Sequence, residues 1–354
     1  MPDMKTIASI APYHGGGLGQ HLSYVVEEAR AAGRLSHYFA KSIKPGDEAV
    51  ATPVRSRWMP LLARYTPLRW SPGGLNHTEN ELFDRAVAGQ LRRPIGGPID
   101  TFLGFGGTAL RCFKQARKLG AKRLELLAAN SHVNNVARLH AQAIARYPLE
   151  TSWLNEAQRQ KTLAEYEMAD VILIASDYSM RIFIENGVSE RKLLRVHYPM
   201  DPRFTPRTTK AQNDGVFRIV YCGSMTAVKG VPDLIEAFTR FRSRDAELRL
   251  VGGTGSRGMN HYMQEAMARD PRIKMAPGDP LPHFRAADVY VHPSYEDNLA
   301  YAACEAIQSG VPAIVTADTG AKEFLREGET GWVVPTGDWK ALLERLEHVA
   351  QLSR

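Results

Sequence analysis

The sequence has few cysteines and no long hydrophobic run. Its 354 residues include only three cysteines, scattered at Cys112, Cys222 and Cys304 without metal-ligand spacing. An odd, sparse set of this kind argues against a disulfide framework and favours a reducing compartment. The first residues contain neither a positively charged leader nor an apolar stretch long enough to cross a membrane. We therefore expect a cytoplasmic protein.

Sequence motifs for metals and nucleic acids are missing as well. The chain contains no Asp-x-Asp motif and no His/Cys cluster with ligand spacing, so we expect neither a metal nor another cofactor. Lys and Arg number 45 against 38 Asp and Glu, a formal net charge of +7. This excess favours acidic partners such as phosphates or anionic lipid. Nucleic acid is not expected, because no zinc spacing, recognition helix or repeated aromatic and basic pattern is present.

The sequence does contain a regular alternation of short apolar runs and amphipathic segments. Residues 5–11 read as a strand, and residues 20–32 read as a helix with apolar residues at helical spacing. Repetition of this pattern predicts parallel, doubly wound α/β sheets. The length favours two domains. A polar stretch rich in Pro and Thr predicts a linker at residues 206–216, between domains at 1–205 and 217–354.

Residues 288–331 form the most informative stretch. An apolar run at 289–291 is followed by the acidic pair Glu296 and Asp297, and then by a predicted helix that carries Glu305. In α/β sheets, ligands bind at the carboxyl ends of strands. Two acids eight helical residues apart lie ~12 Å apart along an axis. One carboxylate could then bind a sugar and the other a ribose, with a diphosphate between them.

This arrangement resembles the retaining glycosyltransferases of family 4, the glycosyl transferases group 1. Their motif is an acid, seven intervening residues and a Glu, which here aligns with Asp297 and Glu305. The family usually has Glu at the first position, whereas this chain has Asp, preceded by Glu296. The resemblance implies a GT-B fold, with two Rossmann-like doubly wound parallel-sheet domains facing a central cleft. The first domain would bind the acceptor and the second the nucleotide-sugar donor.

The loop CGSMTAVKG, residues 222–230, follows a predicted strand and precedes a predicted helix. A diphosphate needs a compact cation and a close backbone approach, and Lys229 followed by Gly230 supplies both. The family commonly has G-R-x4-K-G here, so the resemblance implies donor contacts from Gly223, Ser224 and Lys229, with Ser224 in place of the arginine. The alternative is a surface lysine near a turn.

Residues Asn298, Leu299 and Ala300 are predicted to begin the helix that carries Glu305. Free N–H groups at a helix start suit an anion, so these residues are candidate donor contacts. Glu305 has small apolar neighbours, which places its carboxylate against packed structure, where it needs a polar partner. We expect it to accept hydrogen bonds from the ribose hydroxyls. The alternative is a salt-bridged Glu on an exposed face.

The first domain offers a glycine cluster and a histidine. The turn at residues 15–19, GGGLG, does not keep the GxGxxG spacing of dinucleotide sites, but it resembles the GG-L-G-x-H of the family. The resemblance implies that Gly16 and Gly17 face the donor diphosphate. It also places His132 near the reacting sugar carbon, so that His132, Asp297 and Glu296 are the candidate catalytic residues. The alternative for His132 is a hydrogen-bonding role at a strand end.

Residues 54–70, VRSRWMPLLARYTPLRW, combine basic and aromatic side chains and contain no acid. Such a segment can lie at a bilayer surface, although its prolines interrupt any long helix. The alternatives are a loop that packs on its own domain and a loop that binds an anionic acceptor. The residues of this tentative membrane or acceptor surface are Arg55, Arg57, Trp58, Arg64, Arg69 and Trp70.

The sequence thus predicts a retaining, metal-independent hexosyltransferase of polysaccharide or glycoconjugate biosynthesis. Its donor would be a UDP-sugar, with a GDP-sugar as the alternative, and its acceptor a hydroxyl of a glycan, a lipid-linked sugar or a small molecule. A peripheral contact with the inner face of a membrane is part of this prediction. Two other functions stay open: a sugar-nucleotide epimerase of GT-B architecture and a non-catalytic nucleotide-sugar-binding subunit.

Overall fold

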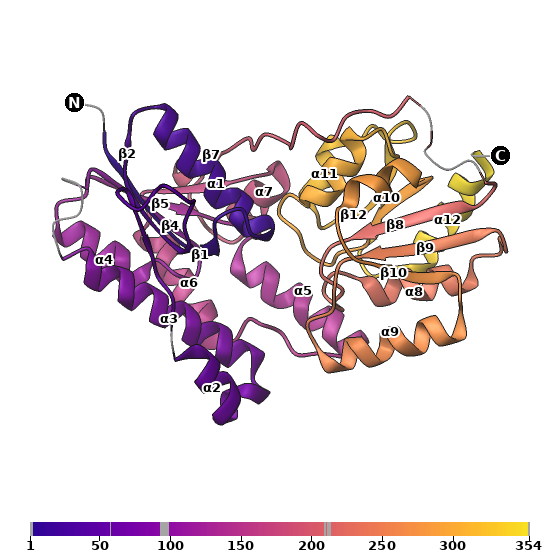
Figure 1. Ribbon diagram of the computed structural model, residues 1–354, viewed down its shortest axis with the longest axis horizontal. Helices are drawn as coiled ribbons and strands as arrows, with labels where there is room; N and C mark the ends of the chain where they lie inside the picture. The colour runs from indigo at the N-terminus through magenta and orange to yellow at the C-terminus, as the bar shows by residue number, and fades with distance from the viewer. Residues whose placement is uncertain (1–2, 57, 93–98, 209, 211–213, 353–354) are drawn as a thin grey trace. The chain divides into compact units, whose positions relative to one another are not determined.

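A computed structural model describes residues 3–56, 58–92, 99–208, 210 and 214–352. The chain forms two compact units (Figure 1). The first contains residues 1–137, 151–175 and 179–198, and the second contains residues 138–150, 176–178 and 199–354. Two short segments from the first part of the sequence therefore belong to the second unit.

The first unit is built on a parallel sheet. Within the described ranges its seven strands have the order β3-β2-β1-β4-β5-β6-β7. The strands are β1 (Lys5–Pro12), β2 (Leu35–Ser42), β3 (Ala51–Pro53), β4 (Thr101–Phe105), β5 (Arg123–Leu127), β6 (Val171–Ile174) and β7 (Leu193–Arg195). The parallel α/β architecture predicted from the alternation is confirmed.

Helices cover both faces of this sheet. Helix α1 packs on β1 and β2, while α3, α4 and α6 share a hydrophobic core with β4 and β5. The elements are α1 (Gly16–Ala31), α2 (Met59–Tyr65), η1 (Pro67–Trp70), α3 (Pro72–Gln90), α4 (Leu110–Lys118), α5 (Val133–Arg146), α6 (Glu156–Met168), α7 (Asp177–Glu185) and η2 (Glu190–Lys192).

The glycine cluster expected as a turn at residues 15–19 is instead the beginning of a helix. Gly15 is the N-cap of α1, and Gly16, Gly17 and Gly19 lie in its first turns. A Cβ on Gly19 would lie only 2.4 Å from the main-chain oxygen of Pro12. The helix therefore starts directly against the end of β1, which is an approach that only glycine permits.

The second unit has a smaller parallel sheet of the order β10-β9-β8-β11-β12-β13. Helices α8, α9 and α12 pack on one hydrophobic core with β8 and β9. The strands are β8 (Phe217–Cys222), β9 (Ala246–Val251), β10 (Ile273–Ala276), β11 (Val289–His292), β12 (Ala313–Thr316) and β13 (Gly331–Val334). The helices are α8 (Val231–Arg240), α9 (Arg257–Arg269), α10 (Pro280–Ala286), α11 (Tyr301–Gln308), η3 (Gly320–Phe324) and α12 (Trp339–Leu352).

Each sheet has one point at which the strand order reverses. In the first sheet, the chain runs outward in one direction from β1 to β2 and in the other from β4 to β5, so the reversal lies between β1 and β4. In the second sheet, it lies between β8 and β11. The loops that follow the two strands at such a reversal diverge and leave room for a ligand. Both units therefore have a defined place for a binding site.

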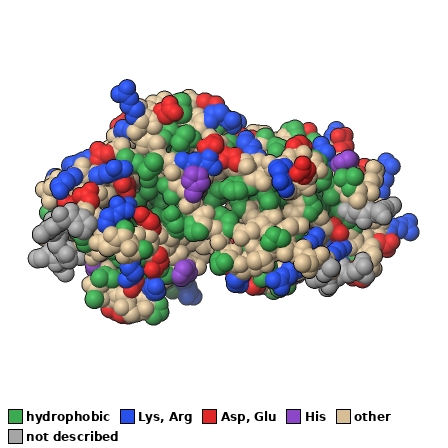
Figure 2. Space-filling model, turned by 90° about the horizontal axis from the view of Figure 1, so that it is seen from above, with side chains coloured by type: hydrophobic (Ala, Val, Ile, Leu, Met, Phe, Trp, Pro, Cys, Tyr) green, Lys and Arg blue, Asp and Glu red, His purple; other side chains and the backbone are tan. Residues whose placement is uncertain are grey.

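Charged side chains do not gather by sign on the face shown in Figure 2, where basic and acidic groups are interspersed with apolar ones. Neither sign of charge is concentrated in one region of this face. Among the described residues, no helix has the length and apolar character needed to span a bilayer.

Candidate functional site

The loops after β8 and β11 touch each other in the second unit. Gly230, the residue before α8, has a φ of +68°, and a Cβ at this position would lie 1.9 Å from the main-chain oxygen of Pro293. The main-chain N–H of Tyr295 also donates to the oxygen of Val228 at 2.9 Å. Val228 and Gly230 are thus both held by the backbone of the second loop. Lys229 lies between these two residues in the sequence, so its main chain is fixed as well.

Lys229 forms an ion pair with Asp297 at this reversal of the strand order. Its Nζ lies 2.6 Å from Oδ2 of Asp297, and Nε2 of His292 lies 3.3 Å from the same oxygen. Burial disfavours the charged form of Asp297, but Lys229 and His292 outweigh it and hold the pKa of this carboxyl well below its usual value. Burial likewise opposes the charge on Lys229, while Asp297 and Glu296 raise its pKa. Both partners are therefore charged at neutral pH.

The ion pair remains open to solvent. The side chains of Lys229 and Asp297 are 30% and 21% exposed. An incoming phosphate could therefore reach the Lys229 ammonium without any change in the fold, and a fixed cation at the end of a parallel strand is suited to bind it.

Asp297 also shapes the turn before α11. Its Oδ1 accepts a hydrogen bond from the main-chain N–H of Ala300 at 3.0 Å, and Ala300 has a φ of +57° as the N-cap of the helix. The helix expected to start at Asn298–Ala300 begins at Tyr301. The N–H of Ala300 is consequently already bonded. The turn residues Asn298 and Leu299 are buried, and Ser176 donates to Oδ1 of Asn298 at 3.0 Å.

The structure distinguishes the two adjacent acids by their surroundings. Asp297 faces Lys229, whereas Glu296 is 2% exposed and contributes its main-chain oxygen to the loop. That oxygen accepts hydrogen bonds from Ser294 Oγ at 2.8 Å and from Lys229 Nζ at 3.3 Å. Asp297 is therefore the carboxylate that forms the ion pair with Lys229.

Glu305 lies on α11 and is buried, with 8% of its surface exposed. Burial, assisted by the nearby Asp201 and Asp279 and opposed by Arg203, raises its pKa to about 7. Arg203 is itself bonded to Asp201 at 2.8 Å and to Asp279 at 3.1 Å. The expected carboxylate against packed structure is thus observed, and it titrates near neutral pH.

The segment Arg138–Glu150 supports the loop that carries Lys229. Sequence reasoning did not identify this segment. Oε1 of Glu150 accepts a hydrogen bond from the main-chain N–H of Ala227 at 2.8 Å. Asp233, on the helix after the loop, is contacted by Arg146 at 3.3 Å and by Tyr147 at 3.0 Å. No local motif marks these residues, because their partners are distant in the sequence. The glycine pair after β9, Gly252 and Gly253, is a sequence feature that could have indicated a close backbone approach at this site. In the structure, a Cβ on Gly252 would lie 2.1 Å from the main-chain oxygen of Gly223.

The predicted residues of the first unit lie in two different environments. Gly16 and Gly17 are exposed at the start of α1. His132 is 2% exposed, and its ring lies 5.0 Å from that of Tyr166 and 5.2 Å from that of Phe183. Burial, assisted by Arg159, lowers the pKa of His132 to about 4, so the imidazole is neutral at pH 7. The roles inferred for these residues stay predictions.

The reversal between β1 and β4 holds a pocket of about 260 Å³. Its floor is the turn after β4, residues 106–108, and its walls include Asn76 and Asn80 of α3 and Gln158 of α6. None of the described residues that line it is ionisable near neutral pH. The first unit thus has an uncharged cavity at the position where the second unit has an ion pair.

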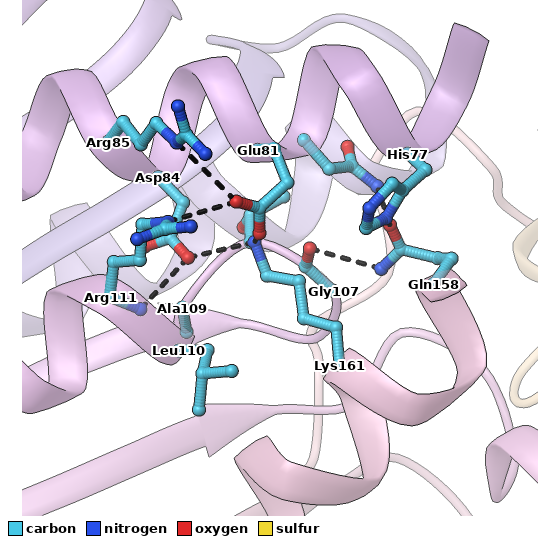
Figure 3. Close-up of polar contacts among 12 residues, drawn as sticks. His77, Glu81, Asp84, Arg85, Gly107, Ala109, Leu110, Arg111, Gln158 and Lys161 are labelled. Carbon is cyan, nitrogen blue, oxygen red and sulfur yellow. Dashed lines mark hydrogen bonds and ion pairs between the residues drawn. The ribbon is translucent and has the colours of Figure 1, made fainter. Parts of the chain in front are cut away.

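A buried polar network contacts the turn that forms the floor of this pocket, and Figure 3 shows part of it. Glu165 accepts hydrogen bonds from the main-chain N–H groups of Gly107, Ala109 and Leu110 at 2.5, 2.8 and 3.1 Å. Nζ of Lys161 lies 2.7 Å from Glu81 and 2.8 Å from Asp84. Asp84 in turn accepts hydrogen bonds from the first N–H groups of α4, so these carboxylates complete the beginning of that helix.

The basic and aromatic stretch forms α2 and η1, neither of which buries a residue. The side chains of Trp58, Tyr65 and Trp70 are 68%, 70% and 70% exposed. The guanidinium of Arg64 lies over the ring of Tyr65, and that of Arg69 over the ring of Trp70. Arg57 lies outside the described residues, and Arg55 and Trp58 line a second hollow of about 340 Å³. Helix α2 contacts η1, and η1 contacts α3 of the same unit, so the alternatives of a membrane surface, an acceptor surface and a loop packed on its own domain all stay predictions.

No group of three or more His, Cys, Asp or Glu side chains in the described part of the chain is arranged to hold a metal ion. The expectation that no metal is required stays a prediction.

Comparison with known proteins agrees with this geometry. Residues 216–351 match the family model of the glycosyl transferases group 1. The capsular polysaccharide biosynthesis glycosyltransferase CapM of Staphylococcus aureus is 25% identical over 203 residues, which is 52% of this chain and 53% of CapM. The aligned regions span about half to two thirds of the length of the curated relatives that the chain matches.

Solved structures are similar over the whole chain. Sucrose-phosphate synthase from Thermosynechococcus elongatus has a TM-score of 0.75 at 19% identity, covering 99% of this chain and 90% of that protein. Anabaena HepE in complex with UDP and glucose has a TM-score of 0.69 at 15% identity, covering 99% and 90%. Both are similar in fold. The chain therefore has the GT-B fold, and its residues 216–351 match the family of the group 1 glycosyltransferases.

Proposed function

We propose that this chain transfers a hexose from a nucleoside-diphosphate sugar, with UDP favoured over GDP, to a hydroxyl group of an acceptor. The observation that carries the proposal is the ion pair of Lys229 and Asp297. It lies where the strand order of the second sheet reverses, within the residues that match the family model. The complex of the structurally similar HepE with UDP and glucose supports a nucleotide-sugar donor.

The donor diphosphate binds at Lys229 in this proposal. The ammonium donates a charge-assisted hydrogen bond to a phosphate oxygen, while Asp297 keeps it oriented before the donor arrives. As the sugar–phosphate bond breaks, negative charge grows on the leaving oxygen, and a cation that is already in place stabilises it without reorganisation. The charge of Lys229 thereby fulfils the function that a metal ion has in other transferases.

Glu305 binds the ribose of the donor. An ionised carboxylate accepts hydrogen bonds from two neighbouring hydroxyls, whereas a protonated one accepts them less well. Because the pKa of Glu305 is raised to about 7, its ability to bind the ribose depends on pH in the physiological range.

The sugar is transferred with retention of its anomeric configuration, as the family resemblance implies. The acceptor oxygen attacks the anomeric carbon on the face from which the diphosphate leaves, so one carbon–oxygen bond forms while the other breaks. The proton of the acceptor hydroxyl passes to the leaving phosphate oxygen. No metal ion takes part in this scheme, which balances atoms and charge without a co-reactant.

The proposal is tested first by binding and then by products. Isothermal titration with UDP, GDP and UDP-glucose should show a nucleotide diphosphate site that is lost in Lys229→Ala. Incubation with UDP-glucose, followed by NMR, should show slow release of glucose with the α-anomer formed first. An isomeric nucleotide sugar as the product would favour the epimerase, and tight binding without any turnover would favour the non-catalytic subunit. Failure to bind any of the three nucleotides would overturn the proposal.

We also infer that α2 and η1 contact an anionic bilayer. Two exposed tryptophans and a tyrosine supply apolar area, and Arg64 and Arg69 supply the complementary charge beside them. Such a combination binds at the headgroup level of a membrane. In co-sedimentation, vesicles containing phosphatidylglycerol should bind the protein, and phosphatidylcholine vesicles should not. Equal binding of the wild type and a variant with Arg64 and Arg69 changed to Ser would contradict the inference.

A further inference from the structure

The uncharged pocket of the first unit has no part in the donor chemistry proposed above. It lies at the carboxyl ends of β1, β4 and β5, where an α/β sheet binds its ligand, and it measures about 260 Å³. This volume lies just below the range of about 300–1,000 Å³ that drug-sized ligands occupy. The pocket therefore suits one small ring rather than an extended chain.

We propose that this pocket binds an uncharged sugar ring of the acceptor, with the indole of Trp153 against the apolar face of the ring and the amide of Asn76 on its hydroxyls. This inference rests on the proposed function and names the class of its acceptor. A sugar ring presents an apolar face of C–H groups and an edge of hydroxyls, and the pocket offers both kinds of partner.

The absence of charge decides against an anionic ligand. None of the described lining residues carries a positive charge, so a phosphate or carboxylate would lose hydration there without an opposite charge to compensate for it. The neighbouring hollow differs, because Lys41 and Glu79 form an ion pair of 2.7 Å there and Arg55 lies beside them. Ile10 lines both cavities. The two cavities thus lie side by side but select for different chemistry.

Asn76 has the properties of a ligand-binding amide. It is half-buried on α3 and lines the pocket, and its side chain has no hydrogen-bond partner within the described residues. An amide both donates and accepts hydrogen bonds, which matches a hydroxyl that does the same. The side chain of Trp153 also lines the pocket and is 41% exposed, an unusual position for a large aromatic residue that serves only packing.

The other amides of the pocket hold its shape. Nε2 of Gln158 donates to the main-chain oxygen of Gly107 at 3.1 Å, and Oε1 of Gln158 accepts from Nδ2 of Asn80 at 3.1 Å. Glu165 fixes the same turn by accepting the N–H groups of Gly107 and Ala109 (Figure 3 shows this turn with Gln158). A floor fixed from both sides is ordered before a ligand arrives, so little entropy is lost on binding.

The probes for the test are the methyl glycosides of glucose, galactose and mannose, with glucose 6-phosphate as the charged counterpart. Saturation-transfer NMR on the full chain should show contact with the ring protons of at least one neutral glycoside. Trp153→Ala and Asn76→Ala should each lower the affinity for this glycoside by about fivefold or more. This is the loss expected for one neutral contact of about 1 kcal/mol. Glucose 6-phosphate should bind more weakly than the neutral glycoside.

Phe324→Ala is the matched control, because Phe324 is 43% exposed on the other unit. It should leave the glycoside affinity unchanged. UDP binding is measured in the same samples, so that the pocket and the donor site are judged separately. If Trp153→Ala fails to bind UDP, Asn76→Ala decides the question, since Asn76 makes no bond that supports the fold. Absence of saturation with every neutral glycoside, unchanged affinity in Asn76→Ala, or equal binding of glucose 6-phosphate would each overturn the inference, even with UDP binding intact.

Discussion

The two units have the same parallel architecture but differ in what they place where the strand order reverses. In the second unit, Lys229 and Asp297 form a charged pair that is open to solvent. In the first unit, the corresponding point is an uncharged pocket, and the charges lie behind it on Lys161, Glu81 and Asp84. A fold of one kind can therefore present a cation to a phosphate in one unit and amides to a neutral ligand in the other.

The units also differ in how their loops are held. The loops of the second unit are fixed by backbone contacts that only glycine allows, as at Gly230 against Pro293. The turn of the first unit is fixed by buried side chains, with Glu165 accepting three main-chain N–H groups. A close backbone contact at a glycine is disrupted when a side chain is added there. A buried polar side-chain network is disrupted when one of its charged groups is removed. The following changes separate the two.

The largest effect is expected for Lys161→Met in the first unit. Its side chain is 4% exposed and its ammonium lies between Glu81 and Asp84, so its removal leaves the buried Asp84 and the largely covered Glu81 without this partner. Loss of one partner from such a cluster destabilises a fold by about 3–5 kcal/mol. Denaturant unfolding would measure the loss, and hydrogen exchange should rise at residues 107–112.

Lys122→Met is the control for this change, because Lys122 is 71% exposed in its pair with Asp100. An exposed pair of this kind is screened by solvent and contributes little to stability, so the loss should be far smaller than in Lys161→Met. Similar losses in the two variants would show that the network of the first unit is no more important than a surface ion pair.

Gly230→Ala should destabilise the second unit by about 2–4 kcal/mol, since it combines a left-handed backbone with a clash against a main-chain oxygen. Gly253→Ala tests the size of the side chain alone, because a Cβ at Gly253 meets nothing within 4 Å. Its effect should stay within about 1 kcal/mol. Thermal unfolding of both variants gives the comparison, and equal melting temperatures would contradict the backbone contact.

Lys229→Ala should lower the affinity for UDP by about 10- to 150-fold, because a hydrogen bond to a charged group contributes about 1.5–3 kcal/mol. The unpaired Asp297 that remains would add repulsion. Lys340→Ala removes an exposed lysine from the same unit and should leave the dissociation constant unchanged. Calorimetric titration of both variants would show whether Lys229 contributes through its position or only through net charge.

The smallest effect is expected from pH. The pKa of Glu305 is raised to about 7, so its carboxylate is mostly protonated at pH 6 and mostly ionised at pH 8. If the ionised form binds the ribose, the affinity for UDP-glucose should rise about tenfold between these pH values, as the ionised fraction does. UDP-glucose is the right ligand, because its diphosphate does not titrate in this range. In Glu305→Gln the affinity should not change with pH, and a persistent rise would assign the dependence to another group.

Much of the fold could be predicted from the sequence, because its cause is local. Alternating apolar runs and amphipathic segments predicted parallel α/β sheets, which the structure confirms. The start of α1 was predicted too late, since glycines that usually mark a turn here permit a helix to begin against β1. The start of α11 was predicted too early, because Asp297 accepts the N–H of Ala300 and closes a separate turn before the helix.

The sequence by itself determined the alternation of strands and helices, and the placement of Lys229, Asp297 and Glu305 around the ends of two strands. These follow from the spacing of residues along a short stretch of chain. Only the tertiary structure decided that Asp297 rather than Glu296 faces Lys229, that Glu150 holds the Lys229 loop, and that the first unit has an uncharged pocket. Each of these depends on residues that are distant in the sequence, and their proximity is set by the packing of whole sheets and helices rather than by any local pattern.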